Sequence, residues 1–314
     1  MKSFLKKILV FFLKFENKKI KKIISKEALK NFHLLDVGAA GNINNKWDMI
    51  KDKIIISLIE PHKQSASKLR EKGFQVVDKF LFSEKNLNLT FYQTKKPTNS
   101  GLLKPNLKYL NKFPDPERFT IENELKIKTS TIDHEFSQIQ NPDFIKIDTE
   151  GAELEILKGS ENTLKKVLGL EIECNFFELR EKSATFEQVA NYLKKFNFVF
   201  IDFINIIRWE KTHHRFTGQP QFADVLFLKD PNEILEKISN NKIDEKEFFN
   251  YLVILTIYNR SDILKMMLDH ANSDQEKKYH LKELYNLVEK KQKKANFLLK
   301  YSHNFTNIIY NVYK

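Results

Sequence analysis

The chain has 314 residues, 41% of them hydrophobic, so it is long and apolar enough to bury the core of one full domain with additions. Its single cysteine, Cys174, excludes a disulfide within the chain, fits a reducing compartment and is expected to be a small buried apolar residue. The net charge of +12 would suit a nucleic-acid binder, but residues 31–230 carry 29 basic against 28 acidic side chains. Because a protein that grips a phosphate backbone concentrates basic charge around its site, we expect no nucleic-acid partner.

The basic excess lies at the N-terminus, where residues 1–30 carry ten lysines against two glutamates. Apolar residues recur at helical spacing from Phe4 to Phe15, with lysines opposite them, which predicts a basic amphipathic helix. The longest apolar run, Ile8 to Leu13, is much shorter than the roughly 20 residues that a membrane-spanning helix needs. Two hypotheses remain open: residues 1–22 lie on an anionic membrane surface, or the helix packs on its own domain.

Strand-like runs alternate with helical patterns across residues 31–230, which predicts an α/β domain with a mostly parallel sheet covered on both faces. We expect strands at residues 33–37, 54–60, 74–82, 87–94, 125–132, 143–148, 169–177, 198–204 and 222–228, and helices at 62–73, 152–167 and 185–197. The interval 95–124 has no clear period. Since so long a connection usually serves as a lid or a substrate loop, its segment 100–106 is the candidate cover of an acceptor.

Glycines mark the first predicted site. Gly38 and Gly41 follow the strand that contains Asp36, and only eight glycines occur in the whole chain. Glycine makes a turn tight and bare, as is needed where the backbone passes close to a nucleotide-like ligand. Glu60 ends the next strand, where an acid can accept hydrogen bonds from both hydroxyls of a ribose.

Two carboxylates mark a third strand end. Asp148 and Glu150 follow the β-branched run of residues 144–147, and Gly151 then opens an amphipathic helical pattern. In open α/β sheets ligands bind at the carboxyl ends of the strands, so these acids are placed for chemistry.

The last part of the chain predicts helices only. Every glycine lies between Gly38 and Gly218 and every proline between Pro61 and Pro231, so the segment after Pro231 contains no strong helix breaker. Helices are expected at residues 245–260, 261–270 and 280–301. The chain therefore divides into an N-terminal helix (1–30), an α/β domain (31–230) and a helical extension (231–314).

The three strand-end motifs carry a family resemblance. The chain resembles the FkbM family of S-adenosylmethionine-dependent methyltransferases in D-V-G-A at residues 36–39, in E-P at 60–61, and in I-D-T-E-G-A-E-L-E-I-L-K-G at 147–159. The resemblance covers residues 33–229. It departs from the family in the first loop, where D-V-G-A-A-G-N replaces the D-V-G-A-N-x-G of many relatives and Trp47 follows.

The resemblance implies a class I methyltransferase with a Rossmann-like, doubly wound sheet of seven strands. It implies that S-adenosylmethionine is the cofactor and that the residues binding it are Asp36, Gly38, Ala39, Gly41, Glu60 and Ser83. Gly38, Ala39 and Gly41 would form the bare turn beside its methionine part. Ser83 would lie near the adenine, or would only cap a turn.

Methyl transfer from a sulfonium is an in-line displacement, so the enzyme must align a nucleophile and remove its proton. Asp148 and Glu150 are the catalytic candidates. One of them is the base for a sugar hydroxyl, or the two hold a divalent metal ion, or both are structural and Glu150 caps the next helix. His213 and His214 are expected to be solvated loop residues and not a metal pair, because adjacent side chains on a strand point to opposite faces.

We therefore predict a cytoplasmic O-methyltransferase that acts on a hydroxyl of a glycan precursor or a related small molecule. Two other classes remain: a nicotinamide-dependent sugar oxidoreductase, and a non-catalytic, membrane-associated scaffold with the same fold. The oxidoreductase would require the glycine motif G-x-G-x-x-G and a catalytic Tyr/Lys pair, which the sequence does not show in a suitable context.

Overall fold

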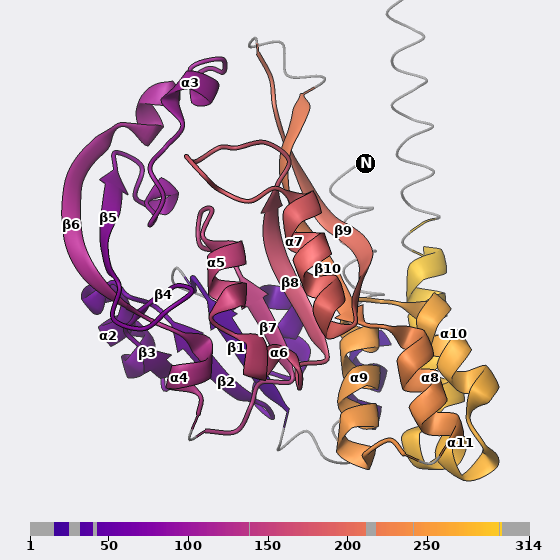
Figure 1. Ribbon diagram of the computed structural model, residues 1–314. Helices are drawn as coiled ribbons and strands as arrows, with labels where there is room; N and C mark the ends of the chain where they lie inside the picture. The colour runs from indigo at the N-terminus through magenta and orange to yellow at the C-terminus, as the bar shows by residue number, and fades with distance from the viewer. Residues whose placement is uncertain are drawn as a thin grey trace, which may run out of the picture. The chain divides into compact units, whose positions relative to one another are not determined.

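The computed structural model describes residues 16–24, 32–39, 43–137, 139–211, 218–240, 242–294 and 296. They fall into two compact units (Figure 1). The α/β unit lies within Asn31–Ile43 and Ile54–Asp230, and the helical unit contains the described parts of Met1–Lys30, Asn44–Lys53 and Pro231–Lys314. Residues 44–53 interrupt the α/β domain in the sequence and belong to the helical unit.

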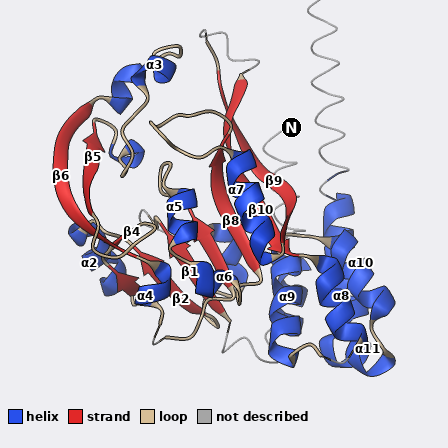
Figure 2. Cartoon of the chain, viewed as in Figure 1, coloured by secondary structure: helices blue, strands red, loops and turns tan. Residues whose placement is uncertain are grey.

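A seven-stranded sheet forms the centre of the α/β unit (Figure 2), and its order is β3-β2-β1-β7-β8-β10-β9. Its strands are β1 (His33–Val37), β2 (Ile55–Ile59), β3 (Gln75–Val77), β7 (Phe144–Ile147), β8 (Gly169–Asn175), β9 (Phe198–Trp209) and β10 (Gln219–Lys229). The first five are parallel, and β10 is antiparallel to both β8 and β9. The doubly wound, mostly parallel sheet is thus confirmed.

The strand order reverses at β1, which has β2 on one side and β7 on the other. All five residues of β1 are buried, as expected of a central strand covered on both faces. In a doubly wound sheet this reversal opens a crevice at the carboxyl ends of the strands. The loops after β1 and β7 therefore lie where a ligand is expected.

Helices cover the sheet where the periodicity predicted them, with two differences: α4 (Ile132–Glu135) was not predicted, and the helix expected at residues 152–167 is divided in two. The other helices of this unit are α2 (Lys63–Glu71), α5 (Glu153–Lys158), α6 (Glu161–Leu164) and α7 (Phe186–Leu193), the last followed by η5 (Lys194–Phe196). The single helix expected at residues 152–167 was wrong, because the chain breaks at Gly159 into α5 and α6. A Cβ atom added at Gly159 would lie 2.3 Å from the backbone oxygen of Phe82, so the chain passes too close there for another residue.

A separate three-stranded sheet has the order β4-β6-β5 and consists of β4 (Phe80–Leu81), β5 (Asn88–Thr94) and β6 (Ile121–Ser130). The run 74–82, expected as one strand, is divided between β3 and β4. β4 joins the small sheet by pairing with β6, and the Phe80 ring lies 4.9 Å from that of Phe91 of β5, centroid to centroid. The interval 95–124 holds the short helices η3 (Pro97–Asn99), α3 (Leu107–Leu110) and η4 (Pro116–Phe119).

The helical unit contains α8 (Pro231–Ser239), α9 (Glu245–Ile257), α10 (Ser261–His270) and α11 (Ser273–Tyr279), with further helical residues at 281–294 and η2 (Asn45–Met49). The sequence did not predict α8 and α11. All residues from Phe248 to Ile257 are buried, so α9 is the central helix of this unit. Trp47 of η2 is also buried and meets Tyr258 edge to face.

Part of the predicted N-terminal helix belongs to the helical unit. Residues 16–24 are helical and bury Ile20, Ile23 and Ile24, and Lys294 Nζ lies 2.9 Å from the buried Glu16 carboxylate. Residues 1–15 lie outside the described residues. Within the described chain, no helix is both long and apolar enough to cross a bilayer.

Candidate active site

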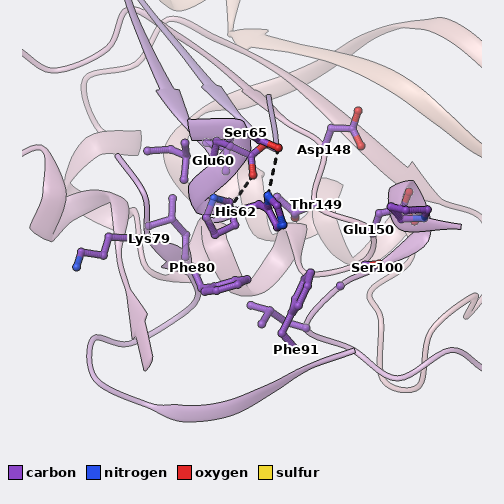
Figure 3. A pocket seen from close by; sticks show the side chains of 18 of the residues that line it. Glu60, His62, Ser65, Lys79, Phe80, Phe91, Ser100, Asp148, Thr149 and Glu150 are labelled. Atoms are coloured by element: carbon purple, nitrogen blue, oxygen red, sulfur yellow. Dashed lines mark hydrogen bonds between the residues drawn. The ribbon is translucent and has the colours of Figure 1, made fainter. Parts of the chain in front are cut away.

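A cavity of about 1480 Å³ opens at the carboxyl ends of the parallel strands in the α/β unit. The strand ends contribute Gly38, Glu60, Asp148, Glu150 and Glu173 to its lining, and further walls come from α2, from Phe80 and Phe91, and from residues 100–102. In Figure 3 the rings of Phe80 and Phe91 lie below Glu60 and His62, and Asp148 and Glu150 lie away from them to the right. A ligand pocket commonly holds about 300–1,000 Å³, so this cavity has room for a cofactor and an acceptor together.

The turn after β1 carries no side chain at Gly38 because its backbone packs directly against the loop after β7. Gly38 has a φ of +89°, and a Cβ atom added to it would lie 1.9 Å from the backbone oxygen of Asp148. The N–H of Asp148 donates to the carbonyl of Val37 at 3.0 Å, and the N–H of Gly38 donates to Ile59 at 3.2 Å. Glycine is therefore required by both conformation and space.

The other residues predicted in this first loop differ in position. Ala39 is buried and does not line the cavity, and Asp36 is buried below it on β1, with Lys146 Nζ 3.8 Å from its carboxylate. Gly41 lies outside the described residues. Their contact with a cofactor stays a prediction.

Glu60 lines the cavity from the end of β2. Its Oε1 accepts a hydrogen bond from the backbone N–H of His62 at 2.9 Å, and burial raises its pKa above the ordinary value against the effect of that bond. Ser83, predicted to lie near the adenine, follows β4 and is not among the residues that line the cavity. The structure thus brings Glu60 to the site and leaves Ser83 outside it.

Asp148 is held by a lysine on its own strand. Lys146 Nζ lies 3.0 Å from the Asp148 carboxylate and is 17% exposed. Burial lowers the pKa of Lys146, but Asp148 and Asp36 outweigh burial and hold that pKa above its ordinary value. Lys146 is therefore a cation fixed between two strand-end acids.

Glu150 is held by an arginine that follows β8. Arg180 is 3% exposed, donates through Nε to the carbonyl of Glu150 at 2.6 Å, and forms an ion pair with its carboxylate through Nη2. Burial raises the pKa of Glu150 to about 7, and Arg180 acts against that rise. A Cβ atom added at Gly151 would lie 3.1 Å from Arg180 Cγ, so the glycine makes room for the arginine stem.

The hypothesis that Glu150 caps the next helix was wrong. The carboxylate that binds the backbone there belongs to Glu153, which accepts from the N–H groups of Thr149 at 2.9 Å and Gly151 at 3.0 Å. Glu150 itself has a left-handed φ of +59° and its side chain binds Arg180 instead.

The predicted cover reaches the cavity through residues 100–102. Gly101 pairs with Tyr92 of β5, and the carbonyl of Lys104 accepts from the N–H of Glu181 at 2.8 Å. The segment therefore connects the small sheet with the chain after β8. Whether it covers an acceptor stays a prediction.

Sequence reasoning missed three charged residues of the site: Lys146, Glu173 and Arg180. Glu173 could have been found, because it is the acid near the end of the strand 169–177, at the edge where ligands bind. Lys146 and Arg180 are recognisable only from their contacts.

Two further kinds of site were considered among the described residues, a metal-binding cluster and a reactive cysteine. In the ranges that the structure describes, no group of three or more His, Cys, Asp and Glu side chains is arranged to hold a metal ion. Cys174 is buried and burial raises its pKa, which confirms it as a small core residue. His213 and His214 lie outside the described residues.

Residues 36–200, more than half of the chain, match the model of the methyltransferase FkbM domain. The chain therefore belongs to the FkbM family and is a methyltransferase of that kind, as the three motifs predicted. No curated protein matches the chain.

Several of the solved structures that are similar to this chain are described as methyltransferases. They include the methyltransferase FkbM of Methylobacillus flagellatus, which is 15% identical with a TM-score of 0.38 over 64% of this chain and 44% of that one. TrmK of M. capricolum with S-adenosyl-homocysteine is 12% identical, with a TM-score of 0.31 over 86% and 95% of the two chains. Magnesium protoporphyrin IX methyltransferase of Synechocystis with bound S-adenosylmethionine is 6% identical, with a TM-score of 0.33 over 70% and 81%. The chain thus spans less than half the length of the Methylobacillus protein.

Proposed function

We propose that the protein transfers a methyl group from S-adenosylmethionine to a hydroxyl oxygen of a glycan precursor or a related small molecule. The observation that carries this proposal is the single cavity in which Gly38, Glu60, Asp148 and Glu150 meet. Family membership supports methyl transfer. The hydroxyl acceptor is supported by the carboxylates, since a hydroxyl must lose its proton and a carboxylate can orient or accept it.

The residues present fit the cofactor. Bound S-adenosylmethionine would supply an electrophilic methyl group on a positively charged sulfur. Gly38 lines the cavity at the turn after β1, and Glu60 presents a carboxylate to ribose hydroxyls. Phe80 and Phe91 offer an aromatic surface for a flat base.

Asp148 and Glu150 are proposed to face the acceptor. Each carboxylate has its position set by a largely buried cation, Lys146 or Arg180. A carboxylate fixed in this way can accept a hydrogen bond from the acceptor hydroxyl and align its oxygen with the methyl carbon, which lowers the entropy cost of the displacement.

Isothermal titration calorimetry with S-adenosylmethionine, S-adenosylhomocysteine and NAD tests the proposal. We expect both sulfur compounds to bind and NAD not to bind. Binding of NAD alone would favour the sugar oxidoreductase, and binding of none of the three would favour a non-catalytic scaffold.

We also propose that residues 1–22 hold the enzyme on the anionic cytoplasmic face of a membrane, near a lipid-linked acceptor, and that no nucleic acid is bound. Each lysine close to such a surface contributes about 1 kcal/mol, so neutralising Lys6, Lys7, Lys14 and Lys18 together should release the protein, as should high salt. Co-sedimentation with anionic and with neutral liposomes checks this. Equal binding to both, or to neither, contradicts the electrostatic anchor.

A further inference from the structure

Three carboxyl groups line the cavity at the ends of β7 and β8: Asp148, Glu150 and Glu173. Lys146 pairs with Asp148 and Arg180 pairs with Glu150. Across the part of the chain that the structure describes, no lysine, arginine or histidine lies within ion-pairing distance of the half-buried Glu173. Of these three carboxyls, Glu173 is therefore the one whose charged neighbours are acids.

Strand register explains why Glu173 is crowded by acids. Ile147 of β7 is paired with Ile172 of β8, so the next residues, Asp148 and Glu173, emerge side by side at the same edge of the sheet. On its other side Glu173 is paired with Asp224 of β10. Burial first, and then the charges of Asp148, Glu150, Glu153 and Asp224, raise the pKa of Glu173 well above its ordinary value.

We propose that Glu173 carries a proton in the free cavity, releases it when the cationic S-adenosylmethionine binds, and accepts the proton of the acceptor hydroxyl during methyl transfer. This inference rests on the proposed function. A positive charge close to a carboxyl favours its ionised form. The sulfonium brings such a charge into the cavity, and the sulfur of S-adenosylhomocysteine does not.

The ion pairs explain why the proton goes to Glu173. Arg180 acts against the rise in the pKa of Glu150 and Lys146 binds Asp148, whereas no cation among the described residues acts against the rise in the pKa of Glu173. Leaving a buried charge without its partner is strongly unfavourable. Protonation of Glu173 strands no cation.

The atoms and charges balance across the step. The acceptor oxygen forms a bond to the methyl carbon, the bond between that carbon and sulfur breaks with its electron pair left on sulfur, and the hydroxyl proton moves to the Glu173 carboxylate. One positive charge on sulfur and one negative charge on Glu173 disappear together. The cavity thus returns to the charge that it had before the cofactor bound.

Calorimetry in two buffers of different ionisation enthalpy tests this without an acceptor. Near neutral pH we expect S-adenosylmethionine to release more protons on binding than S-adenosylhomocysteine does. Because Glu60 would face the same ribose in both ligands, its own titration cancels in the difference. That difference also equals the number of protons taken up when the bound cofactor becomes the bound product, which is the uptake that the proposed step requires.

Variants assign the proton. Glu173→Gln should abolish the difference between the two ligands, whereas Glu187→Gln, the same change at an exposed position on α7, should keep it. The glutamine is neutral and of similar size to the protonated glutamate, so we expect Glu173→Gln to fold, with a melting temperature close to that of the parent.

The pH dependence has a defined sign. Since binding lowers the pKa of Glu173, the affinity for S-adenosylmethionine relative to S-adenosylhomocysteine should rise with pH and level off above the pKa of the free cavity. Equal proton release by the two ligands in the parent protein would overturn the proposal. So would a difference that persists in Glu173→Gln, or one that is lost in Glu150→Gln and kept in Glu173→Gln. Absence of binding by either ligand would contradict the proposed function itself.

Discussion

Acidic residues line two walls of the cavity, Glu60 on the first and Asp148 and Glu150 on the second, and their carboxyl groups are bound in different ways. Glu60 accepts a hydrogen bond from the backbone N–H of His62. Asp148 and Glu150 are instead bound by the side chains of Lys146 and Arg180, which are themselves largely buried. An acid bound to the backbone can be removed without stranding a charge, whereas an acid bound to a buried cation cannot. Changes on the first wall should therefore alter ligand binding, and changes on the second should alter chemistry and stability.

The largest expected effect is on the chemical step at the second wall. Asp148→Asn and Glu150→Gln should each lower the single-turnover rate by about 100-fold, because an acceptor hydroxyl that is no longer aligned with the methyl carbon loses its reactive geometry. Affinity for S-adenosylmethionine should change far less. Rapid-quench measurement with a verified acceptor and calorimetry with the cofactor check both parts, with Glu187→Gln as the control. Unaffected rates in both variants would show that these acids are structural.

The next effect is on stability. Arg180→Gln removes the buried partner of the Glu150 carboxylate, which is itself 30% exposed, and should lower the free energy of unfolding by about 1–3 kcal/mol. The matched change Arg70→Gln breaks an ion pair with Asp78 of 3.4 Å whose side chains are 45% and 39% exposed, so it should cost about 0–1 kcal/mol. Urea unfolding measures both.

The stability loss in Arg180→Gln should depend on pH. The folded pKa of Glu150 is raised to about 7, above its unfolded value, so the folded state binds more protons and stability falls as pH rises between the two values. Removing Arg180 raises the folded pKa further and extends this fall to higher pH. We therefore expect a larger loss at pH 8 than at pH 6. A loss independent of pH would mean that Arg180 acts only through packing.

Gly38 joins the two walls and can be compared with Gly73. Both have a positive φ, +89° and +88°, but an added Cβ meets the Asp148 backbone only at Gly38 and meets nothing within 4 Å at Gly73. Both alanine variants should therefore share the backbone strain, and Gly38→Ala should lose about 1–3 kcal/mol more through overpacking. Equal losses in thermal or urea unfolding would contradict the close contact between the loops after β1 and β7.

The smallest effect is expected at the first wall. Glu60→Ala should weaken binding of S-adenosylmethionine by about 1–3 kcal/mol through loss of charge-assisted hydrogen bonds. Its melting temperature should stay close to that of the parent, because no buried cation depends on Glu60. Unchanged affinity in calorimetry, with the fold intact, would remove Glu60 from the cofactor site.

Several features of the site could be predicted because they are local in the sequence. Gly38 after an apolar run, Glu60 at a strand end, and Asp148 and Glu150 before Gly151 each follow from a short pattern with a direct backbone reason. Parallel strands place their carboxyl ends at one edge, so the convergence of these residues on one cavity follows from the alternation of strands and helices.

Other features depend on contacts between distant segments. At Gly159 the chain passes too close to the Phe82 carbonyl for a side chain, and the run 74–82 divides because its first part pairs with β2 and its last part with β6. Ser83 follows β4 and is not among the residues that line the cavity, although Phe80 and Leu81 of that strand are. A periodic pattern records which residues are apolar and does not record which distant group they meet.

The sequence by itself determined the α/β class and the strand ends that carry the site, because these depend on local backbone conformation and on hydrophobic periodicity. Its three motifs indicated the family by their resemblance to known members. The tertiary structure alone decided which acids have a counter-ion. Lys146 reaches both Asp36 and Asp148, Arg180 reaches Glu150 across 30 positions of sequence, and Glu173 is left among acids by the register of β7 with β8. Charge pairing follows distance in space, and those distances are set only when the strands pair and the loop after β8 folds back onto the cavity.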